Sequence, residues 1–212
     1  PMMYMRLVLP GLVSAWSAGR TEEFRSSAAK TFDLFMLTVI PLVVGGHLVA
    51  TQLIVLIAGE EFATAGPVLE LLILALLGVF LGTLFGHLVV AINKQKVMTW
   101  GYVAVAIISI AGYYLLIPPY GIWGAVWMTL FSEGLVAIIT FALVSRVSGV
   151  FPRLTVTLKA LAASGVMYLA LLGLPNAPVL VDLLVGVLVY GGSLVALRAV
   201  TVSQLKSLLP TR

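Results

Sequence analysis

The chain has 212 residues, of which 61% are hydrophobic and only 9% are charged. A soluble domain carries about 25% charged residues, so this chain has too little charge to cover a soluble surface. Its formal net charge is +4, but the basic residues lie in or beside short loops, which argues against a nucleic-acid partner. It has no cysteine, which excludes disulfides, thiolate metal sites and a cysteine nucleophile.

The apolar segments predict a single all-α integral membrane domain over residues 1–212. The chain opens on Pro1 rather than on a start methionine, and we interpret residues 1–15 as the end of a truncated helix. A short interfacial helix is expected over residues 21–30. Six later stretches are long enough to cross a hydrocarbon core of about 30 Å as helices. Their predicted bounds are 31–57, 65–92, 97–117, 121–144, 155–174 and 178–197.

Lysine and arginine occur in or beside every second connection between these predicted helices. The alternate connections, residues 59–62, 118–120 and 175–177, contain neither. By the positive-inside rule the basic connections are cytoplasmic, which places both ends of the six-helix region in the cytoplasm. Tyr102, near a basic connection, is expected to anchor its helix at the membrane interface. The basic residues that follow this pattern are Arg20, Arg25, Lys30, Lys94, Lys96, Arg146, Arg153, Lys159, Arg198, Lys206 and Arg212.

Three glycines follow one another at four-residue spacing within the predicted helix 65–92: Gly78, Gly82 and Gly86. This spacing puts three missing side chains on one helix stripe, which favours the close approach of a neighbouring helix. A direct role in a substrate groove is the alternative interpretation.

A helix break is predicted near the middle of the first full span, where Pro41 is followed by Gly45 and Gly46. Proline removes one helix hydrogen bond and the glycines weaken the next turn, so the pattern predicts a kink or local unwinding. Transporters often place moving or ligand-binding segments at such breaks. The alternative is a kinked helix buried against its neighbours, with His47 hydrogen-bonded inside the protein.

Glu133 is an acid at the centre of the predicted helix 121–144, where an ionised carboxylate facing lipid would be costly. It must therefore face protein or water. Either it lines a cavity, where it contacts a polar substrate or takes up a proton, or it is a hydrogen-bonded structural carboxyl. His87, beside the glycine stripe, is a further candidate, and its alternative is a hydrogen bond between helices.

Three more charged residues lie within apolar segments. Arg6 is a candidate cavity cation for a phosphate-linked substrate, or it snorkels toward the membrane surface. Glu70 and Asp182 lie nearer the outer ends of their predicted helices, where we expect water or headgroups to solvate them.

No motif of an enzyme occurs in the sequence. There is no GxSxG nucleophile elbow, phosphate-binding loop, HExxH helix or glycine-rich dinucleotide fingerprint, and two isolated histidines do not make a metal site. We therefore predict a protein that is not an enzyme, with no catalytic residue, no metal and no cofactor.

Four short strings, taken in order, resemble one family. They are LVLP at residues 7–10, GEEFATA at 59–65, AINKQK at 91–96 and, as the most specific, LIPPYGIWGA at 116–125. The string at 116–125 can be explained physically. Its prolines are expected to stop one helix, Gly121 permits a tight turn, and Gly124 starts the next helix in close packing. The chain resembles the C-terminal half of bacterial polysaccharide or O-antigen flippases, of the multidrug/oligosaccharidyl-lipid/polysaccharide exporter superfamily.

This resemblance implies one of two helix bundles around a central cavity, in a multi-pass protein of the bacterial cytoplasmic membrane. Such a protein moves a lipid-linked oligosaccharide across the membrane by alternating access for surface polysaccharide biosynthesis. The expected partners are membrane lipid, a polyprenyl-linked glycan substrate and the missing N-terminal helix bundle. The candidate substrate or ion-coupling residues are Glu133, Arg6, His47 and His87.

Other functions stay open at this stage. Another exporter of the same superfamily would carry a drug or a peptidoglycan-precursor lipid. A membrane enzyme of envelope glycan assembly would need a polar catalytic loop, for which the predicted outer loops are short. A non-transporting scaffold would tolerate the loss of its intramembrane acids.

Overall fold

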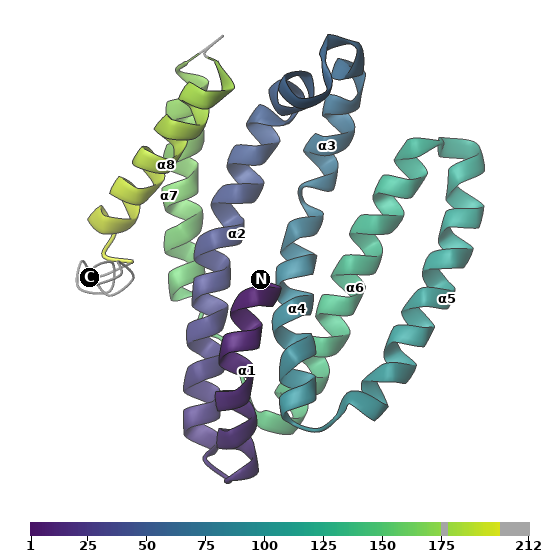
Figure 1. Cartoon of the computed structure of the whole chain (residues 1–212), viewed down its shortest axis with the longest axis vertical. Helices are drawn as coiled ribbons and strands as arrows, with labels where there is room; N and C mark the ends of the chain where they lie inside the picture. The colour runs from purple at the N-terminus through teal and green to yellow at the C-terminus, as the bar shows by residue number, and fades with distance from the viewer. Residues whose placement is uncertain (175–177, 200–212) are drawn as a thin grey trace. The chain divides into compact units, whose positions relative to one another are not determined.

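A computed structural model describes residues 1–174 and 178–199, and in these residues it contains helices and no β-strand (Figure 1). The all-α fold predicted from the sequence is confirmed. The predicted connection 175–177 and the basic residues Lys206 and Arg212 lie outside the described residues. The elements are α1 (Met2–Ser17), α2 (Thr21–Ala58), the 3-10 helix η1 (Glu60–Ala65), α3 (Gly66–Leu72), α4 (Ala75–Ala91), α5 (Gln95–Tyr120), α6 (Ile122–Ser148), α7 (Thr155–Leu172) and α8 (Val179–Ala196).

Membrane-spanning helices dominate the described part of the chain. Five of its helices, α2, α5, α6, α7 and α8, are long and apolar enough to cross a membrane, and a sixth span results if the bent segment from η1 to α4 counts as one. Helices suit this medium because they satisfy their own backbone hydrogen bonds where lipid offers none. The chain is therefore an all-α, multi-pass membrane protein.

α2 is one continuous helix of 38 residues. The sequence predicts two elements here, a helix over 21–30 and a span over 31–57, and that division is wrong because residues 21–40 contain no glycine or proline to end the first. α2 also stays helical through Pro41, Gly45 and Gly46, so the predicted local unwinding does not occur. The Tyr190 hydroxyl on α8 donates to the Leu37 carbonyl that Pro41 leaves without a helix partner, at 2.7 Å.

The predicted helix 65–92, by contrast, is broken. The segment Glu60–Leu72 meets α4 at a bend of 44°. At the break the Leu74 amide donates to the Leu71 carbonyl and the Leu77 amide to the Leu74 carbonyl, both at 3.2 Å. These are the i to i+3 bonds of a tightened turn. Residues 73 and 74 are isoleucine and leucine, so the local sequence carries no signal for this break.

The turn between α5 and α6 depends on glycine. α5 runs through Pro118 and Pro119 to Tyr120, so the predicted stop at residue 117 is wrong. Each proline removes one helix hydrogen bond and crowds the carbonyl four residues earlier, yet the helix continues to Tyr120. The helix ends at Gly121, whose φ of 56° lies in the left-handed region that glycine tolerates. A Cβ at Gly124 would collide with the Leu116 carbonyl, so α6 starts in close contact with α5.

The chain contains two compact units. Unit 1 comprises Pro1–Phe35 and Pro67–Pro152, and unit 2 comprises Met36–Gly66 and Arg153–Arg212. In unit 1, α4 packs against both α1 and α6, and α6 packs against α5. Fully buried side chains of this unit include Met5, Leu12, Phe24, Leu84, Leu88 and Val144.

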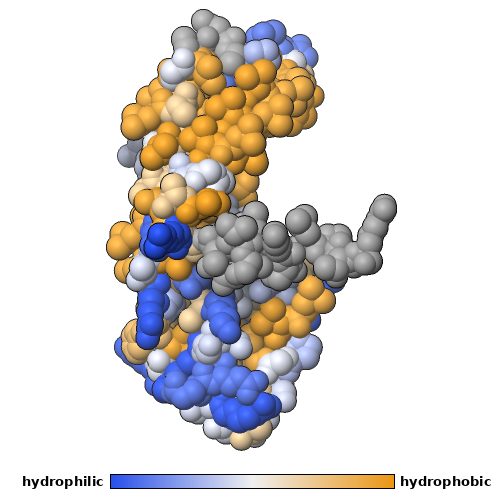
Figure 2. Space-filling view, turned by 90° about the vertical axis from the view of Figure 1, so that its left-hand side faces the viewer, coloured by the Kyte–Doolittle hydropathy of each residue, from blue (hydrophilic) through white to orange (hydrophobic). Residues whose placement is uncertain are grey.

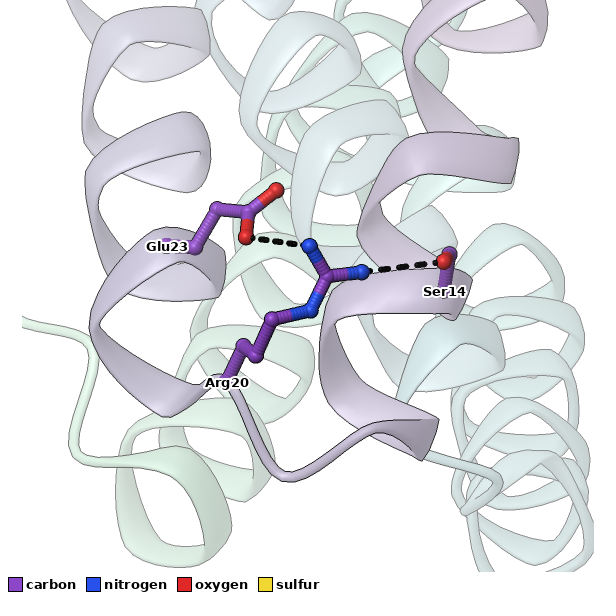
Figure 3. A network of polar contacts seen from close by, with 3 residues as sticks. All are labelled: Ser14, Arg20 and Glu23. Carbon is purple, nitrogen blue, oxygen red and sulfur yellow. Dashed lines mark hydrogen bonds and ion pairs between the residues drawn. The ribbon is translucent and has the colours of Figure 1, made fainter.

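Two arginines tie helix ends together in unit 1. The Arg20 guanidinium bridges the α1–α2 turn, donating to the Glu23 carboxylate at 2.7 Å and to the Ser14 hydroxyl at 3.2 Å (Figure 3). Arg25 Nε donates to the Ser148 carbonyl at the end of α6, at 2.8 Å. Such carbonyls at a helix end have no partner within the helix, so Arg25 joins α2 to the last turn of α6.

Hydrophilic residues are unevenly spread over the surface. Figure 2 shows apolar side chains over much of the face that it displays, with the largest group of hydrophilic ones at its lower end and smaller groups elsewhere. Many exposed side chains of α5 are large and apolar, including Ile107 at 63%, Ile110 at 70% and Leu115 at 69% exposure. Surfaces of this kind are suited to lipid rather than water.

Gly78 marks the closest approach of α4 to α6. A Cβ at this position would lie 2.7 Å from the Cβ of Glu133 and 2.8 Å from its carbonyl carbon. The missing side chain thus lets the two helix backbones meet, as small residues do between membrane helices.

We expect Gly78→Ala to destabilise the protein by about 1–3 kcal/mol, because the added methyl group must push the α6 backbone away. Gly11→Ala is the matched control in the same unit, since a Cβ there meets nothing within 4 Å. It should leave stability unchanged or raise it by about 0.5–1 kcal/mol. Thermal unfolding of purified protein measures both, and equal effects would contradict the close α4–α6 contact.

Candidate functional site

An open cavity of about 450 Å³ lies within unit 1. Its walls come from α4, α5 and α6, with the first residue of α1 at its edge. The lining residues are Met2, Val79, Gly82, Thr83, Gly86, His87, Val90, Tyr102, Glu133 and Val136.

Four polar side chains from three helices meet in this cavity. α4 contributes Thr83 and His87, α5 contributes Tyr102, and α6 contributes Glu133. The structure therefore brings together two of the candidates predicted from the sequence, Glu133 and His87. A carboxylate, an imidazole, a phenol and a hydroxyl offer both donors and acceptors to a polar ligand.

The orientation of the His87 ring follows from its backbone contact. Its Nδ1 lies 2.7 Å from the Thr83 carbonyl oxygen, which can only accept a hydrogen bond. Nδ1 therefore carries the proton and donates. In the neutral ring this leaves Nε2 as an acceptor for a ligand, a water molecule or a proton.

The glycine stripe shapes the cavity as well as the packing. A Cβ at Gly82 would lie 3.4 Å from Val136, and one at Gly86 would lie 3.2 Å from the Tyr102 hydroxyl oxygen. Both glycines line the cavity, so their missing side chains leave room between α4 and its neighbours. Gly78 serves close packing, while Gly82 and Gly86 widen the space one and two turns further along α4.

Neither of the other two candidates lines this cavity. Arg6 is an exposed residue of α1, and His47 is an exposed residue of α2 within unit 2. The lining consequently contains one carboxylate and neither lysine nor arginine. Its charge suits cations, protons and uncharged hydrogen-bonding groups better than phosphates.

Sequence reasoning missed two polar lining residues, Thr83 and Tyr102. Tyr102 is predicted there to be an interfacial anchor, but its hydroxyl lies against Gly86 of a different helix. The sequence offers a partial signal for Thr83, which stands one residue after Gly82 and four before His87. Nothing comparable marks Tyr102, because its place depends on how α5 meets α4.

Asp182 differs from its prediction. Water or headgroups were expected to solvate it, but it is only 7% exposed in the first turn of α8, and its Oδ1 atom is buried without a hydrogen-bond partner. Proximity to a helix end does not ensure exposure, because neighbouring side chains can cover the first turn. Glu70 is half-buried in α3.

Comparisons with known proteins add no relative. Neither the family models nor the curated proteins compared with this chain gave a match. Among the described residues, no three histidines or acids lie close enough together to hold a metal ion.

A water-filled cavity can be tested with introduced cysteines, since the chain has none of its own. We expect Thr83→Cys to react with a water-soluble maleimide at least about tenfold faster than Ile107→Cys, because the reactive thiolate forms only where water solvates it. Ile107 is the control because it is exposed on the apolar face of α5. Equal labelling of both in liposomes would contradict a cavity that admits water.

Proposed function

We propose that the protein takes part in the export of a lipid-linked oligosaccharide across a membrane, as part of a flippase. The observation that carries this proposal is the open cavity with Glu133, His87 and Tyr102 inside a unit of apolar helices. Polar and ionisable groups are costly within a membrane and most often serve a substrate or ion pathway there. The four family strings support the choice of substrate class.

The cavity offers two uses for Glu133. Its carboxylate can accept hydrogen bonds from sugar hydroxyls, with Tyr102 and His87 beside it. It can also take up a proton or another cation and so couple transport to an ion gradient. Both uses need water to reach the carboxylate, and an open cavity provides this.

The phosphates of such a substrate need a different surface. Phosphate groups are bound best by arginine and lysine, and neither residue lines this cavity. We propose that the second helix bundle implied by the family resemblance supplies these cations. Arg6 contributes only if its exposed side chain turns toward that bundle.

A drug exporter of the same superfamily is the second candidate, and the charge of the cavity favours it. One carboxylate without a neighbouring cation suits a positively charged drug. Transport of a fluorescent cationic drug and of a lipid-linked glycan, each in proteoliposomes, separates the two. We rank a membrane enzyme below a transporter as a candidate function, because the sequence contains none of the enzyme motifs considered.

We further propose that the basic connections face the cytoplasm of a bacterial cell, with the protein in its inner membrane. Lys94 and Lys96 lie at the start of α5, and its last residues, from Pro118 to Tyr120, carry no charge. Short loops on the cytoplasmic side of a membrane carry an excess of lysine and arginine.

This orientation predicts sided labelling in intact cells. A membrane-impermeant thiol reagent should label Tyr120→Cys, at the exposed end of α5, and should label Lys96→Cys only after the membrane is opened. These positions lie at opposite ends of the same helix, so each is a control for the other. The reverse pattern would contradict the proposed orientation.

For the carboxylate we expect Glu133→Ala in the full-length protein to abolish polysaccharide export while its amount in the membrane stays normal. Glu133→Gln keeps the shape and most hydrogen bonds but cannot take up a proton. If Glu133 contacts the sugar, export by this variant should be largely retained; if it couples protons, export should be lost.

Glu61→Ala is the matched control, because this acid is exposed in η1 rather than in the cavity. It should leave export unchanged. Normal export by Glu133→Ala would remove Glu133 from the mechanism. Equal losses in Glu61→Ala and Glu133→Ala would show that the effect is not specific to the cavity.

A further inference from the structure

Pro41 leaves one backbone group of α2 without its helix partner. Residue 41 would normally donate its amide proton to the carbonyl of Leu37, four residues earlier, but proline has no amide proton. In an apolar membrane an unsatisfied carbonyl costs considerable free energy. A helix that remains continuous at this point needs another donor.

Tyr190 supplies that donor from a different helix. Its hydroxyl on α8 donates to the Leu37 carbonyl oxygen at 2.7 Å, across 153 residues of sequence. Both residues lie within unit 2, and the bond is partly buried. The hydroxyl takes the place of the amide proton that Pro41 lacks.

One turn after Pro41, α2 is contacted by a side chain of α7. A Cβ at Gly45 would lie 3.4 Å from the Met167 methyl group on α7, and one at Gly186 of α8 would lie 3.6 Å from the Met167 sulfur. Met167 therefore fills the space beside two glycines on two helices. Around Pro41, α2 is thus contacted by α8 at Leu37 and by α7 at Gly45.

We propose that Tyr190 is a latch that keeps α2 continuous at Pro41. While the hydroxyl is bound to the Leu37 carbonyl, the helix stays continuous; once it leaves, this carbonyl has lost its partner and α2 can open at Pro41. Tyr190 is a positioning residue, since it acts through α2. The effect of this hydrogen bond on α2 does not depend on the proposed export function. Only its use in transport rests on that function.

A double-mutant cycle tests the hydrogen bond. Tyr190→Phe should lower the apparent melting temperature by roughly 2–8 °C, because it leaves the Leu37 carbonyl unsatisfied. Pro41→Ala restores the helix amide, so in that background Tyr190→Phe should have almost no effect. Equal losses in the two backgrounds would overturn the latch, because the hydroxyl would then act independently of Pro41.

Tyr168→Phe is the control for the loss of a tyrosine hydroxyl in the same unit. Tyr168 lies on α7 and is 37% exposed, and its variant should melt as the wild type does. A large loss here would show that the effect of Tyr190→Phe is not specific to the bond with α2.

Local opening is read by hydrogen exchange in lipid nanodiscs. In Tyr190→Phe the amides of residues 42–47 should exchange at least about tenfold faster than in the wild type, while those of α6 stay unchanged, because local opening exposes only nearby amides. A rise spread evenly over all helices, or none at residues 42–47, would overturn the proposal of an opening at Pro41.

Transport then shows whether this opening is used. Pro41→Ala should slow glycan export several-fold without lowering the melting temperature, because it removes the flexible point. Unchanged export in Pro41→Ala would overturn the use of this opening in transport. No export by the wild type in the same proteoliposomes would instead contradict the proposed function. The latch would then be tested by the melting temperatures and hydrogen exchange alone.

Discussion

The structure depends on one constraint, namely that each backbone polar group within a membrane needs a partner inside the protein. Long helices meet it by themselves, and three places where a helix is interrupted or ends have a substitute partner. The break between α3 and α4 keeps i to i+3 bonds, the Leu37 carbonyl beside Pro41 accepts from Tyr190, and the end of α6 accepts from Arg25. Irregular backbone thus survives here because a specific donor is supplied from nearby residues or another helix.

Glycines determine where the helices of unit 1 come into close contact and where space remains between them. Lipid gives helices no hydrophobic reason to associate, so close packing of small residues contributes much of the attraction. Gly78 lets α4 meet the backbone of α6, and Gly124 lets α6 start against α5. Further along the same stripe, Gly82 and Gly86 leave the space that becomes the cavity. Successive turns of one helix thus serve close packing at Gly78 and line a cavity at Gly82 and Gly86.

The sequence predicts well what depends on hydropathy and poorly what depends on how helices meet. The apolar lengths predict an all-α membrane protein and four of its spanning helices nearly to the residue at one or both ends. The bend at residues 73 and 74 has no local signal, since both are ordinary helix residues. Glu133 is recognisable as an intramembrane acid, but its neighbours His87 and Tyr102 follow from the packing of α4, α5 and α6, which periodicity alone does not specify.

The charged residues that join helices in unit 1 differ in sign from the charged residue that lines its cavity. At the α1–α2 end of unit 1, Arg20 and Arg25 are engaged with acids and with helix ends, so this part of the positive charge is used in joining helices. The cavity has the opposite character, with Glu133 and no basic lining residue. An anionic headgroup would therefore meet an unfavourable charge beside Glu133, while its uncharged sugars would find acceptors and donors there. It follows that this cavity is suited to uncharged polar groups or cations rather than to phosphates.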